Sequence, residues 1–242
     1  MEDNNFVLLL TCCINPKGMV YTAINDVQTR IKQYYEAFDF YLETTNYNIL
    51  IVENTLFKID QKYLKNERIE YLTFDGNNFD KNLGKGYGEA LIIDHAIKKS
   101  SFLRSEFLKS IVKITGRLKV LNIKMLLDSV DECEMKKCIS ADLDWSCKVA
   151  YSYFFIANLS FFKFFLKDIN LINDSRGFYF EHLLATKIKD RNRTHIKFIP
   201  LYTSAEIIGI SGSTGKSYSI KTSYLRKFFS KIKKIYLKLY LK

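Results

Sequence analysis

The 242-residue sequence is poor in the residues that interrupt regular structure, with 10 glycines and 2 prolines. This scarcity disfavours collagen-like, linker-rich and many-turned all-β folds, and it favours long helices and strands. Hydrophobic residues make up 48% of the chain and charged residues 26%, which is too apolar for a disordered protein. We therefore expect a globular protein.

The sequence also lacks targeting, membrane-spanning and metal-binding signatures. Its start, MEDNNFVLLLTCCINP, is acidic, whereas a secretory signal begins with basic residues. The stretch AYSYFFIANLSFFKFFL is too broken by polar residues to span a bilayer. The five cysteines form no CxxC pair and the three histidines are scattered, so neither a zinc site nor a disulfide framework is predicted. We expect a cytoplasmic protein with reduced thiols.

Positive charge is concentrated at the C-terminus. The net charge is +11, and residues 221–242 hold eight basic and no acidic residues, so the other 220 residues carry 29 minus 26, or +3. An apolar stripe at helical spacing runs through this tail: Leu225, Phe228, Phe229, Ile232, Tyr236, Leu239 and Tyr240. The pattern predicts a basic amphipathic helix at an anionic membrane surface. The alternative is a terminal helix that packs on its own domain; no nucleic-acid recognition motif is present.

The first half of the chain alternates strand-like apolar runs with helix-like periods. Strands are expected at residues 6–14, 48–52, 69–74 and 110–114, and helices at 29–42 and 87–98. This alternation predicts an α/β fold with a doubly wound, mostly parallel sheet. Because ligands of such sheets bind at the carboxyl ends of the strands, we expect the site there.

The second half is less regular. We expect a short strand and loop at residues 138–147, a helix at 178–187 and a strand at 196–200. The aromatic stretch at residues 151–165 has no clear period. The predicted organisation is a single domain over residues 1–220, with halves at 1–120 and 121–220, followed by the tail at 221–242.

Two motifs of the first half suit an anionic ligand. Leu83-Gly84-Lys85-Gly86-Tyr87-Gly88-Glu89-Ala90 opens a predicted helix, whose N-terminal N–H groups and Lys85 can meet an anion; a tight connection is the alternative. Lys113-Ile114-Thr115-Gly116-Arg117 ends the fourth predicted strand. An arginine there can grip a diphosphate through two hydrogen bonds, or simply lie in solvent.

Two acidic motifs lie in the second half. Asp142-Leu143-Asp144 resembles the DXD pair that holds Mg²⁺ or Mn²⁺ in nucleotide-sugar enzymes, although such spacing is common in loops. Glu181 and His182 begin a predicted helix, where Glu181 can act as a general base or merely favour the helix dipole. His182 can orient a substrate or fill the same turn.

The segment IIGISGSTGKS, at residues 207–217, ends like a phosphate-binding P-loop. The spacing fails, because the position that requires the first glycine holds Ile210. A mobile loop that closes over a polar ligand with Ser211, Ser213 and Lys216 explains the segment better. A P-loop-type kinase or NTPase remains an alternative function.

In chain order, LLLTCCINP, the strand ending in VEN, GKGYGEA, KITGR, YFEHLLA and GISGSTGK resemble bacterial GT-A-type glycosyltransferases of capsular polysaccharide and lipopolysaccharide (O-antigen) biosynthesis. The likeness covers roughly residues 6–217. It implies a GT-A-like, Rossmann-type sheet and a hexosyltransferase that moves a sugar from a nucleotide-sugar donor to a glycan or lipid-linked acceptor. It also implies peripheral association with the inner face of the plasma membrane.

The resemblance assigns residue roles as well. Thr11, Glu53 and Asn54 are expected near the nucleotide, and Lys85, Gly86, Gly88 and Glu89 near its sugar-phosphate part. Glu181 would supply the base of an inverting reaction, although members of the family more often carry Glu-Asp than Glu-His. A retaining course remains open.

No DXD pair follows the fourth strand, so Lys113 and Arg117 are expected to neutralise the leaving diphosphate, as in metal-independent relatives. No cofactor is certain, and Mn²⁺ or Mg²⁺ at Asp142 and Asp144 stays possible. The remaining alternative is a non-catalytic adaptor at the membrane surface.

Overall fold

The computed structural model describes residues 6–19, 22–105, 110–129, 137–191, 195–212, 214–218, 232–237 and 239–241. A seven-stranded sheet has the order β3-β2-β1-β4-β7-β6-β8. Its strands are β1 (Phe6–Cys12), β2 (Asn48–Glu53), β3 (Ile69–Thr73), β4 (Ser110–Thr115), β6 (Cys138–Leu143), β7 (Ala150–Ala157) and β8 (Lys197–Phe198). Within this sheet β7 runs antiparallel to both neighbours, and the other pairs are parallel. The predicted α/β fold with a mostly parallel sheet is confirmed.

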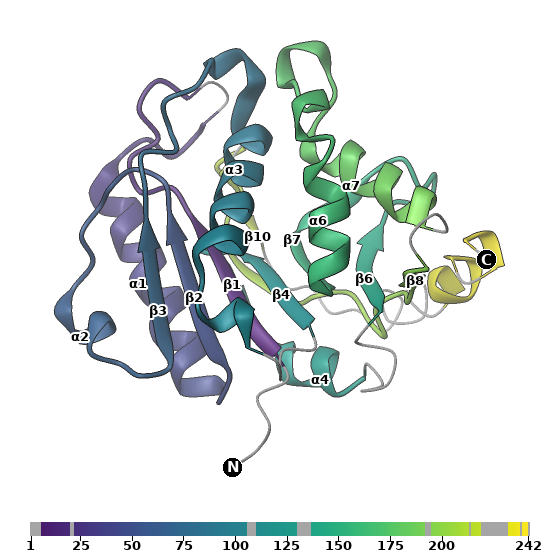
Figure 1. The fold of residues 1–242 in the computed structure, drawn as a ribbon, viewed down its shortest axis with the longest axis horizontal. Helices are drawn as coiled ribbons and strands as arrows, with labels where there is room; N and C mark the ends of the chain where they lie inside the picture. Colours follow the sequence, from purple (N-terminus) through teal and green to yellow (C-terminus); the bar gives the residue numbers. More distant parts are fainter. Residues whose placement is uncertain are drawn as a thin grey trace.

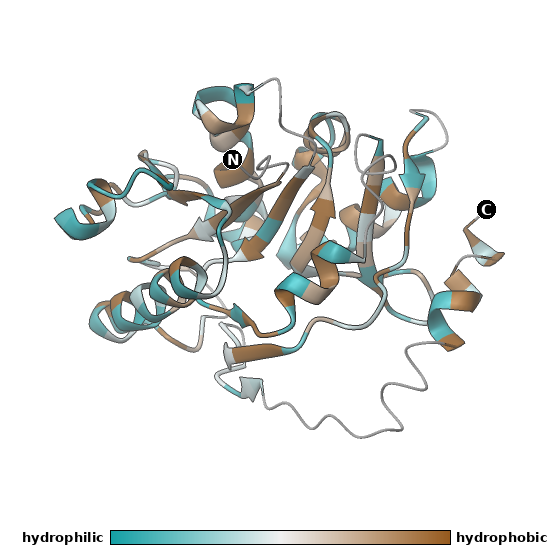
Figure 2. Ribbon diagram, turned by 90° about the horizontal axis from the view of Figure 1, so that it is seen from below, coloured by the Kyte–Doolittle hydropathy of each residue, from teal (hydrophilic) through white to brown (hydrophobic). Residues whose placement is uncertain are grey.

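Helices cover both faces of the sheet (Figure 1). One face packs against α1 (Val27–Thr44) and α4 (Ile123–Asp128), and the other against α3 (Gly84–Lys99), α6 (Leu159–Leu166) and α7 (Phe180–Lys189). Short helices complete the inventory: α2 (Gln61–Leu64) and the 3-10 turns Lys81–Leu83, Phe102–Arg104, Ile169–Leu171 and Asp174–Arg176. Figure 2 shows apolar strands inside and polar helix surfaces outside. Such burial on two sides explains why β1, buried at every position, is a continuous apolar run.

The strand order creates a crevice. From β1 the chain leads to β2 on one side, and from β3 it crosses back to β4 on the other side of β1. Connections therefore diverge at the carboxyl ends of β1 and β4, where open α/β sheets bind ligands. Because β7 is antiparallel to β4, with Phe154 opposite Ile114, its first residues lie at this same edge.

The aromatic stretch that had no clear period forms β7 and α6. Asn158 separates the two elements, and its side-chain oxygen accepts a hydrogen bond from the backbone N–H of Phe161 at 2.9 Å. This N-cap interaction starts α6. The sequence signal was present, because asparagine is a preferred N-cap residue, but the neighbouring aromatic residues concealed it.

The segment predicted as a mobile loop is a β-hairpin. Strands β9 (Ile207–Ile210) and β10 (Ser217–Tyr218) pair antiparallel, and β9 pairs with β5 (Lys119–Val120) in a small three-stranded sheet. A P-loop connects a strand to a helix, whereas here the glycine-rich turn connects two strands. The hairpin therefore lacks the context of a P-loop.

The described part of the tail lies at the edge of the sheet, near β6 and β8 (Figure 1). Residues 232–237 and 239–240 are helical. Residues 221–231 of the predicted helix are outside the described residues. Leu237 and Leu241 are buried and belong to the hydrophobic core. None of the helices in the described ranges combines the length and apolarity needed to cross a bilayer.

Candidate active site

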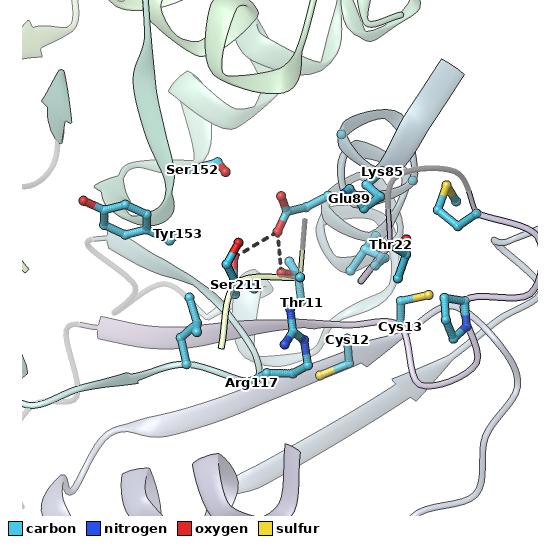
Figure 3. Close-up of a pocket in the computed structure, with 18 of the residues that line it drawn as sticks. Thr11, Cys12, Cys13, Thr22, Lys85, Glu89, Arg117, Ser152, Tyr153 and Ser211 are labelled. Carbon is cyan, nitrogen blue, oxygen red and sulfur yellow. Dashed lines mark hydrogen bonds between the residues drawn. The ribbon is translucent and has the colours of Figure 1, made fainter. Parts of the chain in front are cut away.

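A cavity of about 760 Å³ lies at the carboxyl ends of β1, β2 and β4, within the size range of small-molecule sites. Figure 3 shows side chains from distant parts of the sequence converging on it. Of the predicted site residues, the following line the cavity: Thr11, Asn54, Lys85, Gly86, Gly88, Glu89, Arg117, Glu181 and Ser211. The expected position at the switch of the sheet and much of the predicted set thus coincide.

Arginines form one side of the cavity. Arg117 follows β4, is 7% exposed, and donates hydrogen bonds through Nη1 to Gln33 Oε1 at 3.1 Å and to the Ile210 carbonyl at 3.0 Å. Arg30 on α1 donates through Nε to the Cys13 carbonyl at 2.9 Å. In the described part of the chain neither guanidinium has a carboxylate within 4 Å. Both can therefore attract an anion.

The helix α3 contributes its first two turns. Lys85 lies there, and burial lowers the pKa of its ammonium group, while Asp174 opposes the shift. Glu89, one turn later, accepts a hydrogen bond from Thr11 Oγ1 at 2.8 Å, as Figure 3 shows. The predicted glycine-rich loop is thus the beginning of a helix, and its N-terminal turn faces the cavity.

The glycines of this turn permit close packing. Gly84 has φ +85°, and a Cβ at this position would collide with the Asp174 carboxylate. A Cβ on Gly86 would lie 2.9 Å from Cβ of Phe180, at the start of α7. These glycines therefore bring α3 against the segment that carries Asp174 and Glu181.

Two carboxylates stand on the second-half side. Glu181 is in the first turn of α7, and its Oε1 accepts a hydrogen bond from Ser152 Oγ at 2.5 Å. Asp174 also lines the cavity. Burial raises the pKa of the Asp174 carboxyl, and the negative charge of Glu181 adds to the shift. The cavity therefore holds acidic groups as well as cations.

Asn54 lies at the end of β2 with 2% of its surface exposed. Its Oδ1 is buried and has no hydrogen-bond donor among the described residues, although the residue lines the cavity. An unsatisfied buried acceptor costs about 1–3 kcal/mol. A ligand that donates an N–H or O–H to this atom would remove the cost.

Two predicted donor-binding residues need correction, because they are buried outside the cavity lining. Lys113 is 0% exposed, with Nζ 2.5 Å from Glu89 Oε1 and 2.5 Å from the Ser152 carbonyl. Glu53 is also 0% exposed, and its carboxylate accepts hydrogen bonds from the backbone N–H groups of Ile14, Thr55 and Phe57. Lys113 thus supports the cavity from beneath, and Glu53 fixes the loops after β1 and β2.

The predicted acceptor-side residues are dispersed. His182 does not line the cavity; its Nδ1 accepts the backbone N–H of Tyr179 at 3.1 Å and so caps α7. Lys216 is exposed on the hairpin and does not line the cavity. Ser211 does line it, whereas Ser213 lies outside the described residues.

Asp142 and Asp144 do not fit a metal site. Asp142 Oδ1 is paired with Lys233 Nζ at 2.6 Å, and Asp144 accepts the backbone N–H groups of Lys148 and Val149 at 2.9 Å each. Neither aspartate lines the cavity. In the described ranges, no three His, Cys, Asp or Glu side chains group as a metal site would require.

Sequence reasoning missed several residues of the cavity. They are Arg30 and Tyr34 on α1, Asp174 before α7, Tyr151, Ser152 and Tyr153 on β7, Tyr179, and Tyr218 on β10. Arg30 lies inside a helix and carries no local signal. Asp174 belongs to the NDSRG turn, whose approach to α3 depends on long-range packing. The β7 residues were missed because the antiparallel pairing with β4 was not predicted.

Comparisons with known proteins give a limited result. No family model matches the chain, and no curated protein matches its sequence. Among solved structures, the chain is similar to a crystal structure from Desulfovibrio desulfuricans G20, whose own assignment as a nucleotide-diphospho-sugar transferase is provisional. The sequence identity is 10%, the TM-score is 0.46, and the match covers 82% of this chain and 80% of the other.

Proposed function

We propose that this protein is a glycosyltransferase that uses a nucleotide-sugar donor. The observation that carries the proposal is one cavity, at the switch point of the sheet, where Arg117 and Arg30 stand with the carboxylates of Asp174 and Glu181. Displacement of a sugar from a nucleoside diphosphate needs both kinds of group, because cations stabilise the departing diphosphate and a carboxylate accepts a proton. The ordered sequence motifs support the same class.

The donor occupies the β1–β4 side in this proposal. Arg117 binds the diphosphate through the N–H groups that Gln33 and the Ile210 carbonyl leave available. The N-terminal turn of α3 with Lys85 adds positive potential. Asn54 Oδ1 accepts a hydrogen bond from the nucleoside, since it is buried and has no donor among the described residues.

Glu181 is the proposed base. Its carboxylate takes the proton of the acceptor hydroxyl, and the hydroxyl oxygen forms a bond to the anomeric carbon as the bond from that carbon to the phosphate oxygen breaks. The nucleoside diphosphate leaves with the electron pair, and the configuration inverts. Ser152 fixes the Glu181 carboxylate through the 2.5 Å hydrogen bond. No step requires the residues Asp142 and Asp144.

The proposed acceptor is a glycan or a lipid-linked sugar in bacterial surface polysaccharide synthesis, as the sequence resemblance implies. Aromatic rings on the second-half side suit a sugar ring: Tyr151 and Tyr153 are stacked at 5.4 Å, and Tyr153 meets Tyr218 edge-on at 6.3 Å. All three line the cavity.

Calorimetry with UDP, GDP and CDP tests the donor site. At least one should bind, and Arg117→Ala should weaken binding about 10- to 100-fold, because a hydrogen bond to a charged group is worth about 1.5–3 kcal/mol. Arg104→Ala is the matched control, since Arg104 is exposed and outside the cavity. Failure of all three nucleotides to bind, or equal binding by both variants, would contradict the proposal.

The base is tested by Glu181→Gln once a donor is identified. This variant should keep donor affinity and lower turnover by about 10²- to 10⁴-fold, because the amide cannot accept the proton. Asp174→Asn is the informative comparison, since Asp174 lines the same cavity. Normal turnover in Glu181→Gln with a large loss in Asp174→Asn would transfer the role of base to Asp174.

A further inference from the structure

The helical residues 232–240 of the tail are held against the domain by one side. Leu237 and Leu241 are 3% and 8% exposed and join the core cluster. The ion pair between Lys233 and Asp142 fixes the same side to β6. At 3.6 residues per turn, Ile232 and Leu239 lie roughly opposite Leu237 and Leu241. Packing therefore determines which side of the tail faces outward.

The outward side is apolar. We define the tail face as the exposed large side chains of this region, with their exposed fractions: Ile232 (40%), Ile235 (61%), Leu239 (64%), Tyr240 (57%) and the adjacent Trp145 (50%). Tyr236 links the last two, since its ring lies 5.8 Å from that of Trp145 and 5.6 Å from that of Tyr240. Five exposed large apolar side chains on one short stretch form an interaction surface rather than scattered surface residues.

The charge of the tail identifies the partner. Residues 221–242 carry eight basic and no acidic residues, and one of these, Lys233, is neutralised by Asp142, which leaves seven. A second copy of this chain, at net charge +11, would be repelled. An anionic bilayer matches both properties, because it receives apolar and aromatic side chains and attracts basic residues. We propose that the tail face docks on an anionic lipid bilayer.

The docked surface adjoins the cavity. Nζ of Lys233 lies 5.8 Å from the ring centre of Tyr151, and Tyr151 lines the cavity on the side proposed for the acceptor. Docking would therefore bring this wall of the cavity close to the lipid surface, where a lipid-linked acceptor resides. This last step rests on the proposed function, whereas docking itself does not.

Vesicle flotation tests the docking of the full-length protein. It should float with phosphatidylcholine vesicles that contain phosphatidylglycerol, and not with phosphatidylcholine alone. Raising the salt to about 1 M should reduce flotation, because the Debye length falls from about 10 Å to about 3 Å. The double variant Ile235→Glu, Leu239→Glu should lower the partition coefficient at least tenfold. Leu171→Glu is the matched control, since Leu171 is equally exposed at 58% but outside the tail face.

Equal flotation of the double variant and the control would overturn the proposal. Light scattering gives the second readout: a wild-type dimer that the double variant converts to monomer, with vesicle binding unchanged, would make the tail face a contact between copies and also overturn it. UDP, GDP and CDP affinities are measured on the same variants. Their retention with loss of flotation supports docking, whereas absence of nucleotide binding with flotation intact would contradict the transferase function alone.

Discussion

The buried ion pair of Lys113 and Glu89 beneath the cavity gives a sharp prediction about stability. Nζ of Lys113 lies 2.5 Å from Glu89 Oε1 and 3.3 Å from Thr115 Oγ1, and the lysine is fully buried. Lys113→Met keeps most of the side-chain volume but removes the charge. Glu89 then retains the hydroxyl of Thr11, at 2.8 Å, and that of Thr115, but loses its cation.

Removal of one partner from a buried ion pair costs about 3–5 kcal/mol. In a protein of this size about 1 kcal/mol shifts the melting temperature by roughly 2–4 °C, so Lys113→Met should melt about 6–20 °C lower. The double variant Lys113→Met, Glu89→Gln should recover part of the loss, because neither group is then charged. Its free energy of unfolding should exceed the sum of the single effects by about 0.5–3 kcal/mol.

Urea denaturation of the four proteins in this cycle measures the coupling. Lys98→Met is the matched control, because the Lys98–Asp94 pair at 2.6 Å is on the surface and such pairs contribute at most about 1 kcal/mol. If Lys113→Met were no more destabilising than Lys98→Met, or if the two substitutions of the cycle were additive, the assignment of Lys113 to a buried structural pair would be refuted.

Three further predictions concern the cavity and the metal. Because burial raises the pKa of Asp174, the folded protein binds that proton more tightly than the unfolded chain; Asp174→Asn should therefore be more stable than wild type at neutral pH, with the difference closing as pH falls toward about 4, which urea titrations at several pH values measure. Burial raises the pKa of Cys13 to about 11, so iodoacetamide should label it slowly at pH 7.5 and faster with each pH unit above, and rapid labelling at pH 7 in peptide mapping would contradict this. Because Asp142 is paired with Lys233, transferase activity should survive excess EDTA; loss with rescue by Mn²⁺ would return the two aspartates to a metal role.

The first half of the fold was predictable because its information is local. β1, β2 and β4 are buried on both faces, so their sequences are continuous apolar runs, and the intervening helices have an apolar period. The carboxyl ends of such strands must meet at one edge. Thr11, Asn54 and Arg117 could therefore be placed together without a structure.

The second half depends on pairing that no local pattern encodes. β7 lies between β4 and β6 although it follows both in the chain, and this order brings Ser152 to Glu181. The fate of Lys113 was equally hidden, because a lysine at the end of a strand has the same sequence pattern whether it faces a ligand or a buried Glu89. Contact with a distant carboxylate decides between the two.

The glycines of α3 join the two halves of the cavity. Gly84 leaves room for the Asp174 carboxylate, and Gly86 allows Phe180 to approach, so the α3 turn that carries Lys85 packs directly on the turn that precedes Glu181. A phosphate-binding turn needs glycines for the approach of a ligand, whereas these glycines admit side chains of the protein itself. Their contribution to the proposed reaction is therefore indirect: they set the separation between the cationic side and the carboxylates, which determines whether a leaving diphosphate and an attacking hydroxyl fit on opposite sides of one sugar.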